Sequence, residues 1–140
     1  MNKYGLKGNA PEELSGVLQL IAFLYVGVAY LNDANLSNNE LDRMVEILKK
    51  YGYKDEDSIK LIQETVSWFD DSLKKDVWQD NIIQCVKLLK NSKGWDEELK
   101  DTIHTDLYSI NTADGLIDLK GDKFTGEKQL KVVNTIMELF

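Results

Sequence analysis

Residues 14–31, LSGVLQLIAFLYVGVAYL, decide the fold of this chain because they are apolar on every side of a helix. Such a helix lies either at the centre of a helical bundle or across a membrane, and a span needs roughly 20 apolar residues with basic flanks. The flanks here are acidic, with Glu12 and Glu13 before the stretch and Asp33 after it. We therefore expect a buried central helix and no direct membrane span.

The rest of the chain carries the spacing of amphipathic helices. Ser37 and Glu40 form a capping box that begins a second helix, which is expected to end near Tyr51. Asp55 and Asp96 are the expected caps of the third and fifth helices. The predicted apolar faces are Ile59, Ile62, Val66, Phe69 and Leu73 in the third helix, Trp78, Ile82, Cys85, Val86 and Leu89 in the fourth, Leu99, Ile103, Leu107 and Ile110 in the fifth, and Leu130, Val133, Ile136, Met137 and Phe140 in the last.

Length and composition set the number of domains and the fold class. The chain has 140 residues, of which 43% are hydrophobic, and this is enough for one buried core. No stretch keeps the two-residue alternation of a strand for long. We predict an all-α fold, a single bundle of about six helices over residues 11–140, preceded by a loose lead-in of residues 1–10.

The charge and the rare residues exclude several functions. Lys plus Arg number 17 and Asp plus Glu number 24, so the net charge is −7, which argues against a nucleic-acid partner. The single cysteine, Cys85, excludes an intramolecular disulfide and fits a reducing, cytoplasmic setting. Cys85 is expected in the core, and the single histidine, His104, has no partner nucleophile in the sequence. We therefore expect neither an enzyme nor an organic cofactor.

Three tryptophans could form an aromatic binding surface, because Trp is enriched at interfaces. The spacing of Trp78 places it in the core of the fourth helix. Trp68 and Trp95 are expected at the boundary between core and surface.

Two junctions between helices look related. Residues 31–36, LNDANL, and residues 112–117, TADGLI, each follow an apolar helix and precede an amphipathic one. In the first junction Glu40 comes seven residues after Asp33, and in the second Glu127 comes thirteen after Asp114. Two such copies predict a weak internal repeat with pseudo-two-fold symmetry.

The second junction, ADGLI at residues 113–117, resembles the signature of the TerB-like family, with Glu127 in the place of the family's acid after an insertion. Residues 33–36 with Glu40 are a looser copy that lacks the glycine. The family comprises the tellurite-resistance protein TerB and related domains, including one found on some DnaJ co-chaperones. The resemblance implies a compact helical fold, an acidic cluster that binds a divalent metal, a cytoplasmic role in stress response and no catalytic activity.

The metal prediction rests on oxygen ligands from both junctions, provided that the two lie at one end of the bundle. The candidate ligands are Asp33, Glu40, Asp114, Asp118, Asp122 and Glu127. Such oxygens suit a hard cation, although the sequence does not distinguish calcium, magnesium and zinc. An EF-hand does not fit, because Asn38 and Met44 stand where its glycine and its bidentate acid belong. A purely structural explanation is also open, since the capping box accounts for Glu40.

Two function classes follow from the sequence. The first is a non-enzymatic TerB-like domain whose acidic junctions bind a divalent cation or a basic protein, including one in a membrane-associated complex. The second is an acidic protein-interaction module, such as an inhibitor or an immunity-like protein, which needs no metal.

Overall fold

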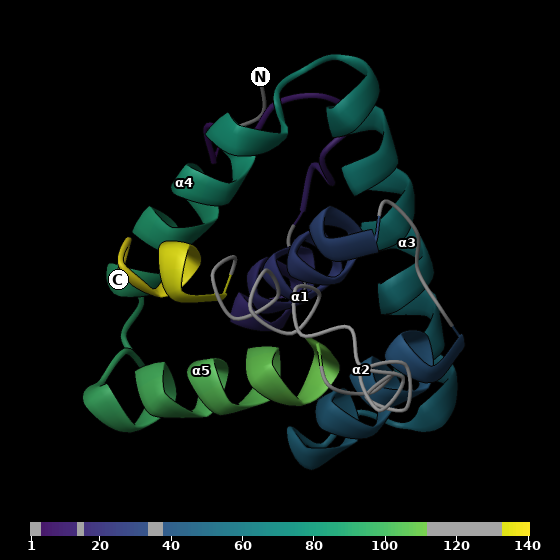
Figure 1. Cartoon of the computed structure of the whole chain (residues 1–140), viewed down its shortest axis with the longest axis vertical. Coiled ribbons are helices and arrows are strands. Elements are labelled where there is room, and N and C mark those ends of the chain that lie inside the picture. Colours follow the sequence, from purple (N-terminus) through teal and green to yellow (C-terminus); the bar gives the residue numbers. More distant parts are fainter. Residues whose placement is uncertain (1–3, 14–15, 34–37, 112–132) are drawn as a thin grey trace, which may run out of the picture.

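The computed structural model describes residues 4–13, 16–33, 38–111 and 133–140, and all regular structure in these ranges is helical. Within the described ranges five helices follow one another, and residues 133–137 add a short helical segment near the C-terminus (Figure 1). The helices are α1 (Val17–Asp33), α2 (Asn38–Lys50), α3 (Asp55–Lys74), α4 (Trp78–Lys90) and α5 (Glu97–Asn111). The predicted all-α bundle is confirmed.

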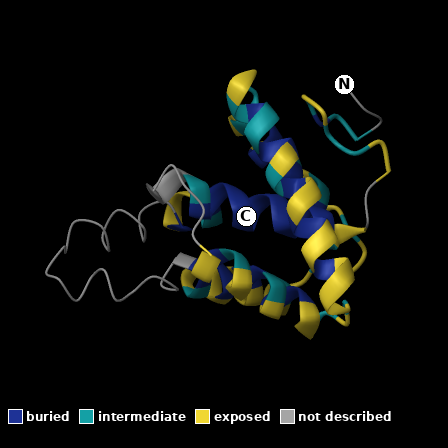
Figure 2. Cartoon of the chain, turned by 90° about the vertical axis from the view of Figure 1, so that its right-hand side faces the viewer, coloured by how far each residue is buried: buried dark blue, intermediate teal, exposed yellow. Residues whose placement is uncertain are grey.

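Helix α1 lies at the centre of the bundle and packs against α3, α4 and α5 (Figure 1). Every residue from 19 to 29 is buried, whereas the surrounding helices alternate between buried and exposed faces (Figure 2). The central part of α1, residues 19–29, is thus covered by protein on all sides, as the sequence predicts. Among the described helices, none combines the length and the apolar character that crossing a membrane requires.

Aromatic rings hold α3 against α1. The Phe23 ring centroid lies 4.1 Å from that of Trp68 and 5.3 Å from that of Phe69. Gly27 permits this approach, because a Cβ at that position would lie 3.0 Å from Phe69 Cε2. Trp68 is only 1% exposed, so the expectation that it lies at the boundary is wrong. Trp78, expected in the core, is instead partly exposed at its edge.

The buried face of α3 is rotated about the helix axis relative to the predicted face. Ile62 and Phe69 are buried as expected, but Ile59 is 46% exposed and Val66 is only partly buried. The residues that α3 buries are Ser58, Leu61, Ile62, Thr65, Trp68, Phe69 and Ser72. The face shifts because Trp68 turns its ring toward α1, so part of the apolar stripe is left on the side that faces α2.

The helix ends confirm one predicted cap and correct another. Asp96 caps α5, since its Oδ1 accepts a hydrogen bond of 2.7 Å from the amide of Leu99. Asp55 is not a cap, because it is the first residue inside α3 and Lys54 occupies the cap position. Its carboxylate still suits the positive end of the helix dipole.

The N-terminal residues are not the loose lead-in that the sequence predicts. Residues 4–10, which we call the N-terminal strap, pack against α3 and α4, and Leu6 is fully buried in the core. Two glycines shape the strap, since Gly5 has φ +78° and Gly8 has φ +71°. Side chains other than glycine avoid this left-handed region.

We predict that Gly8→Ala lowers the free energy of unfolding by about 1–3 kcal/mol, because alanine is strained at this φ. The added Cβ would also lie 2.8 Å from Asp71 Oδ2. The matched control is Gly94→Ala, where an added Cβ meets nothing within 4 Å and which should change stability by less than about 0.5 kcal/mol. Urea unfolding of both variants measures the difference, and equal midpoints would contradict the prediction.

Candidate functional site

The predicted metal ligands fall mostly outside the part of the chain that the structure describes. Asp33 is the last residue of α1, but its side chain is outside that part. Asp114, Asp118, Asp122 and Glu127 are outside it altogether, as is the whole of the second junction. Only the Glu40 side chain is described, so the structure does not place the ligands relative to one another. The metal site and the internal repeat stay predictions.

Glu40 lies in the first turn of α2 and is 2% exposed. A carboxylate there is favoured by the helix dipole, in agreement with the predicted capping role, although Ser37 lies outside the described residues. Within residues 4–13, 16–33, 38–111 and 133–140, no three His, Cys, Asp or Glu side chains form a group that could hold a metal ion.

Cys85 occupies the core position that the sequence predicts. Cys85 is fully buried on α4, and burial raises the pKa of its thiol far above the ordinary value. The thiol therefore stays protonated and behaves as a small apolar side chain. His104 is exposed on α5.

A polar cluster that the sequence analysis missed joins three parts of the bundle. Tyr25 on α1 donates a hydrogen bond of 2.8 Å to Asp106 Oδ2 on α5, and Tyr51 donates one of 3.5 Å to the same atom. Lys50 Nζ lies 3.9 Å from Asp106 Oδ1. Spacing gives the signal, because Asp106 falls between Ile103 and Ile110 on the apolar face of α5.

Burial sets the ionisation of this cluster. Desolvation raises the pKa of Asp106, while the two tyrosine hydrogen bonds and Lys50 oppose the rise. Desolvation, followed by the charge of Asp106, raises the pKa of Tyr25 well above its usual value of 10.0. The shared carboxyl group of Asp106 ties α1, the end of α2 and α5 together.

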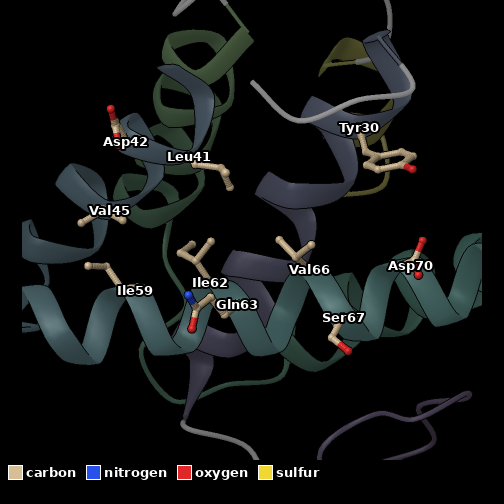
Figure 3. A pocket seen from close by; sticks show the side chains of 10 residues that line it. All are labelled: Tyr30, Leu41, Asp42, Val45, Ile59, Ile62, Gln63, Val66, Ser67 and Asp70. Carbon is tan, nitrogen blue, oxygen red and sulfur yellow. The ribbon is translucent and has the colours of Figure 1, made fainter. Parts of the chain in front are cut away.

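A groove between α2 and α3 is lined mainly by apolar side chains. It has a volume of about 510 Å³. Leu41 and Val45 reach into it from α2, above Ile59 and Ile62 on α3, and Tyr30 closes one end (Figure 3). Its apolar lining comprises Tyr30, Leu41, Val45, Ile59, Ile62 and Val66. We call it the α2–α3 groove.

The polar lining of the α2–α3 groove is acidic. Asp42 and Asp70 lie at its edges, together with the neutral side chains of Gln63 and Ser67 (Figure 3). Asp70 Oδ2 pairs with Lys74 Nζ at 3.1 Å, one helical turn away and outside the lining. The groove thus presents carboxylates and no basic lining residue to an incoming molecule.

No family model, no curated protein and no solved structure matches this chain. The resemblance to the TerB-like family therefore stays a prediction, and it rests mainly on residues 113–117, outside the described part. The function has to be argued from the geometry of the described surface.

The sequence contains a signal for the α2–α3 groove, although the periodicity of α3 places Ile59 and Val66 on its predicted core face. Helix α3 carries apolar residues over a wider arc than one neighbour can cover, with Leu61 and Phe69 on one side and Ile59 and Val66 on the other. Periodicity shows the two faces but not which of them meets α1. Only the packing of the aromatic rings decides that.

We predict that the free energy of unfolding falls as the pH rises above 10, because Tyr25 holds its proton more strongly in the folded state than in the unfolded state. This stabilisation is fully present below the unfolded pKa and is lost as the pH rises toward the folded pKa. Tyr25→Phe should flatten the alkaline slope and cost about 1 kcal/mol at neutral pH through the lost hydrogen bond.

Urea unfolding at a series of pH values measures this slope, and Tyr108→Phe is the control because Tyr108 is an exposed tyrosine on α5. An alkaline slope of Tyr25→Phe equal to that of the unchanged protein would show that Tyr25 is not the group responsible.

Proposed function

We propose that this chain is a non-enzymatic protein-interaction domain that binds a basic, amphipathic helix of a partner in the α2–α3 groove. The observation that carries the proposal is an open apolar groove in which Ile59 is 46% exposed on an otherwise well-packed bundle. Exposed apolar surface that is concave and rimmed by polar residues is typical of interaction sites.

A helix is the occupant that the shape of the groove favours. Its walls are two helices, and Leu41 and Val45 on α2 are spaced four residues apart, as are Ile62 and Val66 on α3. Such rows form the ridges between which the apolar face of a third helix packs. Covering them removes apolar surface from water, which contributes about 25 cal/mol for each Å².

The charge of the groove favours a basic partner. Asp42 and Asp70 edge the apolar lining, and the chain as a whole carries a net charge of −7. Opposite charge on the partner would speed the encounter and select the partner more than it would raise the affinity. This is the acidic interaction module that the sequence allows as one of its two function classes.

The TerB-like function is the second candidate. It would place a divalent cation at the acidic junctions of a stress-response protein related to tellurite resistance, with the cytoplasmic location that the sequence predicts. The observation in its favour is that Glu40, one of the expected ligands, is a buried carboxylate in the first turn of α2, shortly after the first junction.

We predict that Ile59→Asp weakens the binding of a synthetic leucine and lysine helix at least about tenfold, because a charge replaces an apolar contact in the groove. Ile83→Asp is the matched control, since Ile83 is 42% exposed on α4 and lies outside the groove lining. Fluorescence anisotropy of the labelled peptide measures both affinities. Equal losses in the two variants would show that the peptide binds without using the groove.

Divalent cations distinguish the two candidate functions. Peptide binding in the groove should weaken as salt rises, through screening, and should be the same with and without a chelator. If cation binding is the function, chelator-stripped protein should give saturable amide shifts with calcium, magnesium or zinc, and Asp33→Asn and Asp114→Asn should each weaken that binding. Peptide binding that disappears with chelator would contradict the groove proposal as stated.

A further inference from the structure

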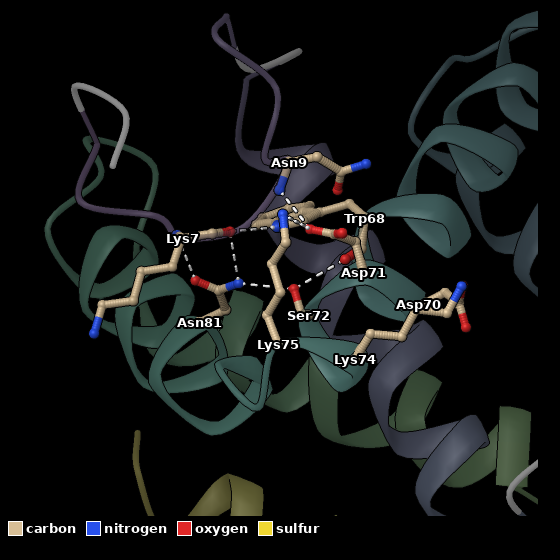
Figure 4. A network of polar contacts seen from close by, with 9 residues as sticks. All are labelled: Lys7, Asn9, Trp68, Asp70, Asp71, Ser72, Lys74, Lys75 and Asn81. Carbon is tan, nitrogen blue, oxygen red and sulfur yellow. Dashed lines mark hydrogen bonds and ion pairs between the residues drawn. The ribbon is translucent and has the colours of Figure 1, made fainter.

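The side chains of α3 and α4 hold the N-terminal strap by its main chain (Figure 4). Asn81 Oδ1 accepts a hydrogen bond of 2.8 Å from the Lys7 amide, and Asn81 Nδ2 donates one of 3.0 Å to the Lys7 carbonyl. Trp68 Nε1 donates to the same carbonyl at 3.2 Å. A single amide side chain thus pairs with both the backbone N–H and the backbone C=O of one residue, as a neighbouring strand would.

Further contacts extend this recognition to both sides of Lys7. Gln84 Nε2 donates a hydrogen bond of 2.8 Å to the Tyr4 carbonyl, and Asp71 Oδ2 accepts one of 2.8 Å from the Asn9 amide. The Asn9 amide is the main cause of the lowered pKa of Asp71, ahead of its pairing with Lys75. The strap is therefore held by its backbone from residue 4 to residue 9.

The side chains of the cleft are also held by hydrogen bonds that do not involve the strap. Asn81 is fully buried, and its Nδ2 also donates a hydrogen bond of 2.9 Å to Ser72 Oγ. Ser72 Oγ in turn donates to the Trp68 carbonyl at 2.9 Å, within α3 (Figure 4). A side chain fixed in this way loses little entropy when it binds a peptide.

The ligand that fits this cleft has a recognisable sequence. Leu6 is the apolar anchor, and Lys7 Nζ pairs with Asp80 Oδ2 at 2.9 Å. Glycine is favoured at positions 5 and 8. An added Cβ would lie 2.9 Å from Gln84 Nε2 at Gly5 and 2.8 Å from Asp71 Oδ2 at Gly8, and both residues have a positive φ. Gly-Leu-Lys-Gly at residues 5–8 is thus the motif that the cleft selects.

We propose that the cleft between α3 and α4 is a peptide-binding site that takes the N-terminal strap of a second copy of this chain, by the same contacts that it makes with its own. The hydrogen bonds that hold the strap main chain join residues 61 to 80 positions apart, so they do not depend on the connection between strap and bundle. Two copies that exchange their straps would bury the same groups as two closed monomers.

The connection between strap and bundle determines the protein concentration at which straps are exchanged between copies. A strap tethered by a few residues competes for its own cleft at an effective concentration in about the millimolar range. The unchanged chain is therefore closed at low concentration, and a weakened strap leaves the cleft open to one from outside. This site lies apart from the α2–α3 groove, so either proposal can fail without the other.

The first test uses the synthetic peptide of residues 4–11 and the Lys7→Pro variant of the 140-residue chain. Proline has no backbone N–H, so this variant loses the hydrogen bond that Asn81 Oδ1 accepts from residue 7. The peptide should bind Lys7→Pro saturably, and the Trp68 indole resonance should return to its position in the unchanged protein. Lys7→Ala keeps the backbone amide, so it should bind the peptide about fivefold more weakly than Lys7→Pro does, because one partly buried hydrogen bond separates the two variants. A peptide that itself carries Lys7→Pro is the negative control.

The second test mixes two full-length variants that are defective in different parts. Asn81→Ala has an intact strap and a damaged cleft, while Lys7→Pro has the reverse. The mixture should form a heterodimer in sedimentation velocity, whereas each variant alone stays monomeric.

Circular dichroism confirms that each variant is folded, and Gly8→Ala replaces Lys7→Pro if the latter is not. A folded strap variant that binds neither the peptide nor the Asn81→Ala chain overturns the proposal. Equal binding of the control peptide also overturns it.

Discussion

The covering of α1 is the constraint on which the rest of the structure depends. A helix with buried residues from 19 to 29 has no face to offer water, so other parts of the chain must surround it. Helices α3, α4 and α5 pack directly against it (Figure 1). The apolar surface of α1 thus drives the assembly of amphipathic helices that bury only one face each.

The same constraint explains the positions of the polar groups inside the bundle. The Tyr25 hydroxyl belongs to the buried part of α1 and needs a partner, and Asp106 on α5 supplies it at 2.8 Å. Trp68 has its ring against Phe23 and directs its indole N–H to the Lys7 carbonyl of the strap. The polar atoms of Tyr25 and Trp68 are thus satisfied by segments distant in the sequence.

The two proposed binding sites arise from different faces of α3. Its buried face carries Trp68 and Ser72, which face the strap cleft together with Asn81 of α4. Its other face carries Ile59 and Val66, which α2 covers only in part and which line the α2–α3 groove. One long helix with apolar residues over a wide arc therefore serves both sites.

The helical class, the central place of residues 19–29, the cap at Asp96 and the burial of Cys85 followed from the sequence alone. These features depend on local periodicity and on hydrogen bonds between neighbouring residues, which one sequence contains in full. The tertiary structure alone decided that Trp68 is buried rather than Trp78, that Asp106 lies in the core and that residues 4–10 form a strap. Each of these depends on contacts between residues distant in the sequence, such as the 81 positions between Tyr25 and Asp106, and on the choice between two apolar faces of α3. Periodicity cannot make that choice, because it shows which residues share a face of the helix and not which part of the chain packs against that face.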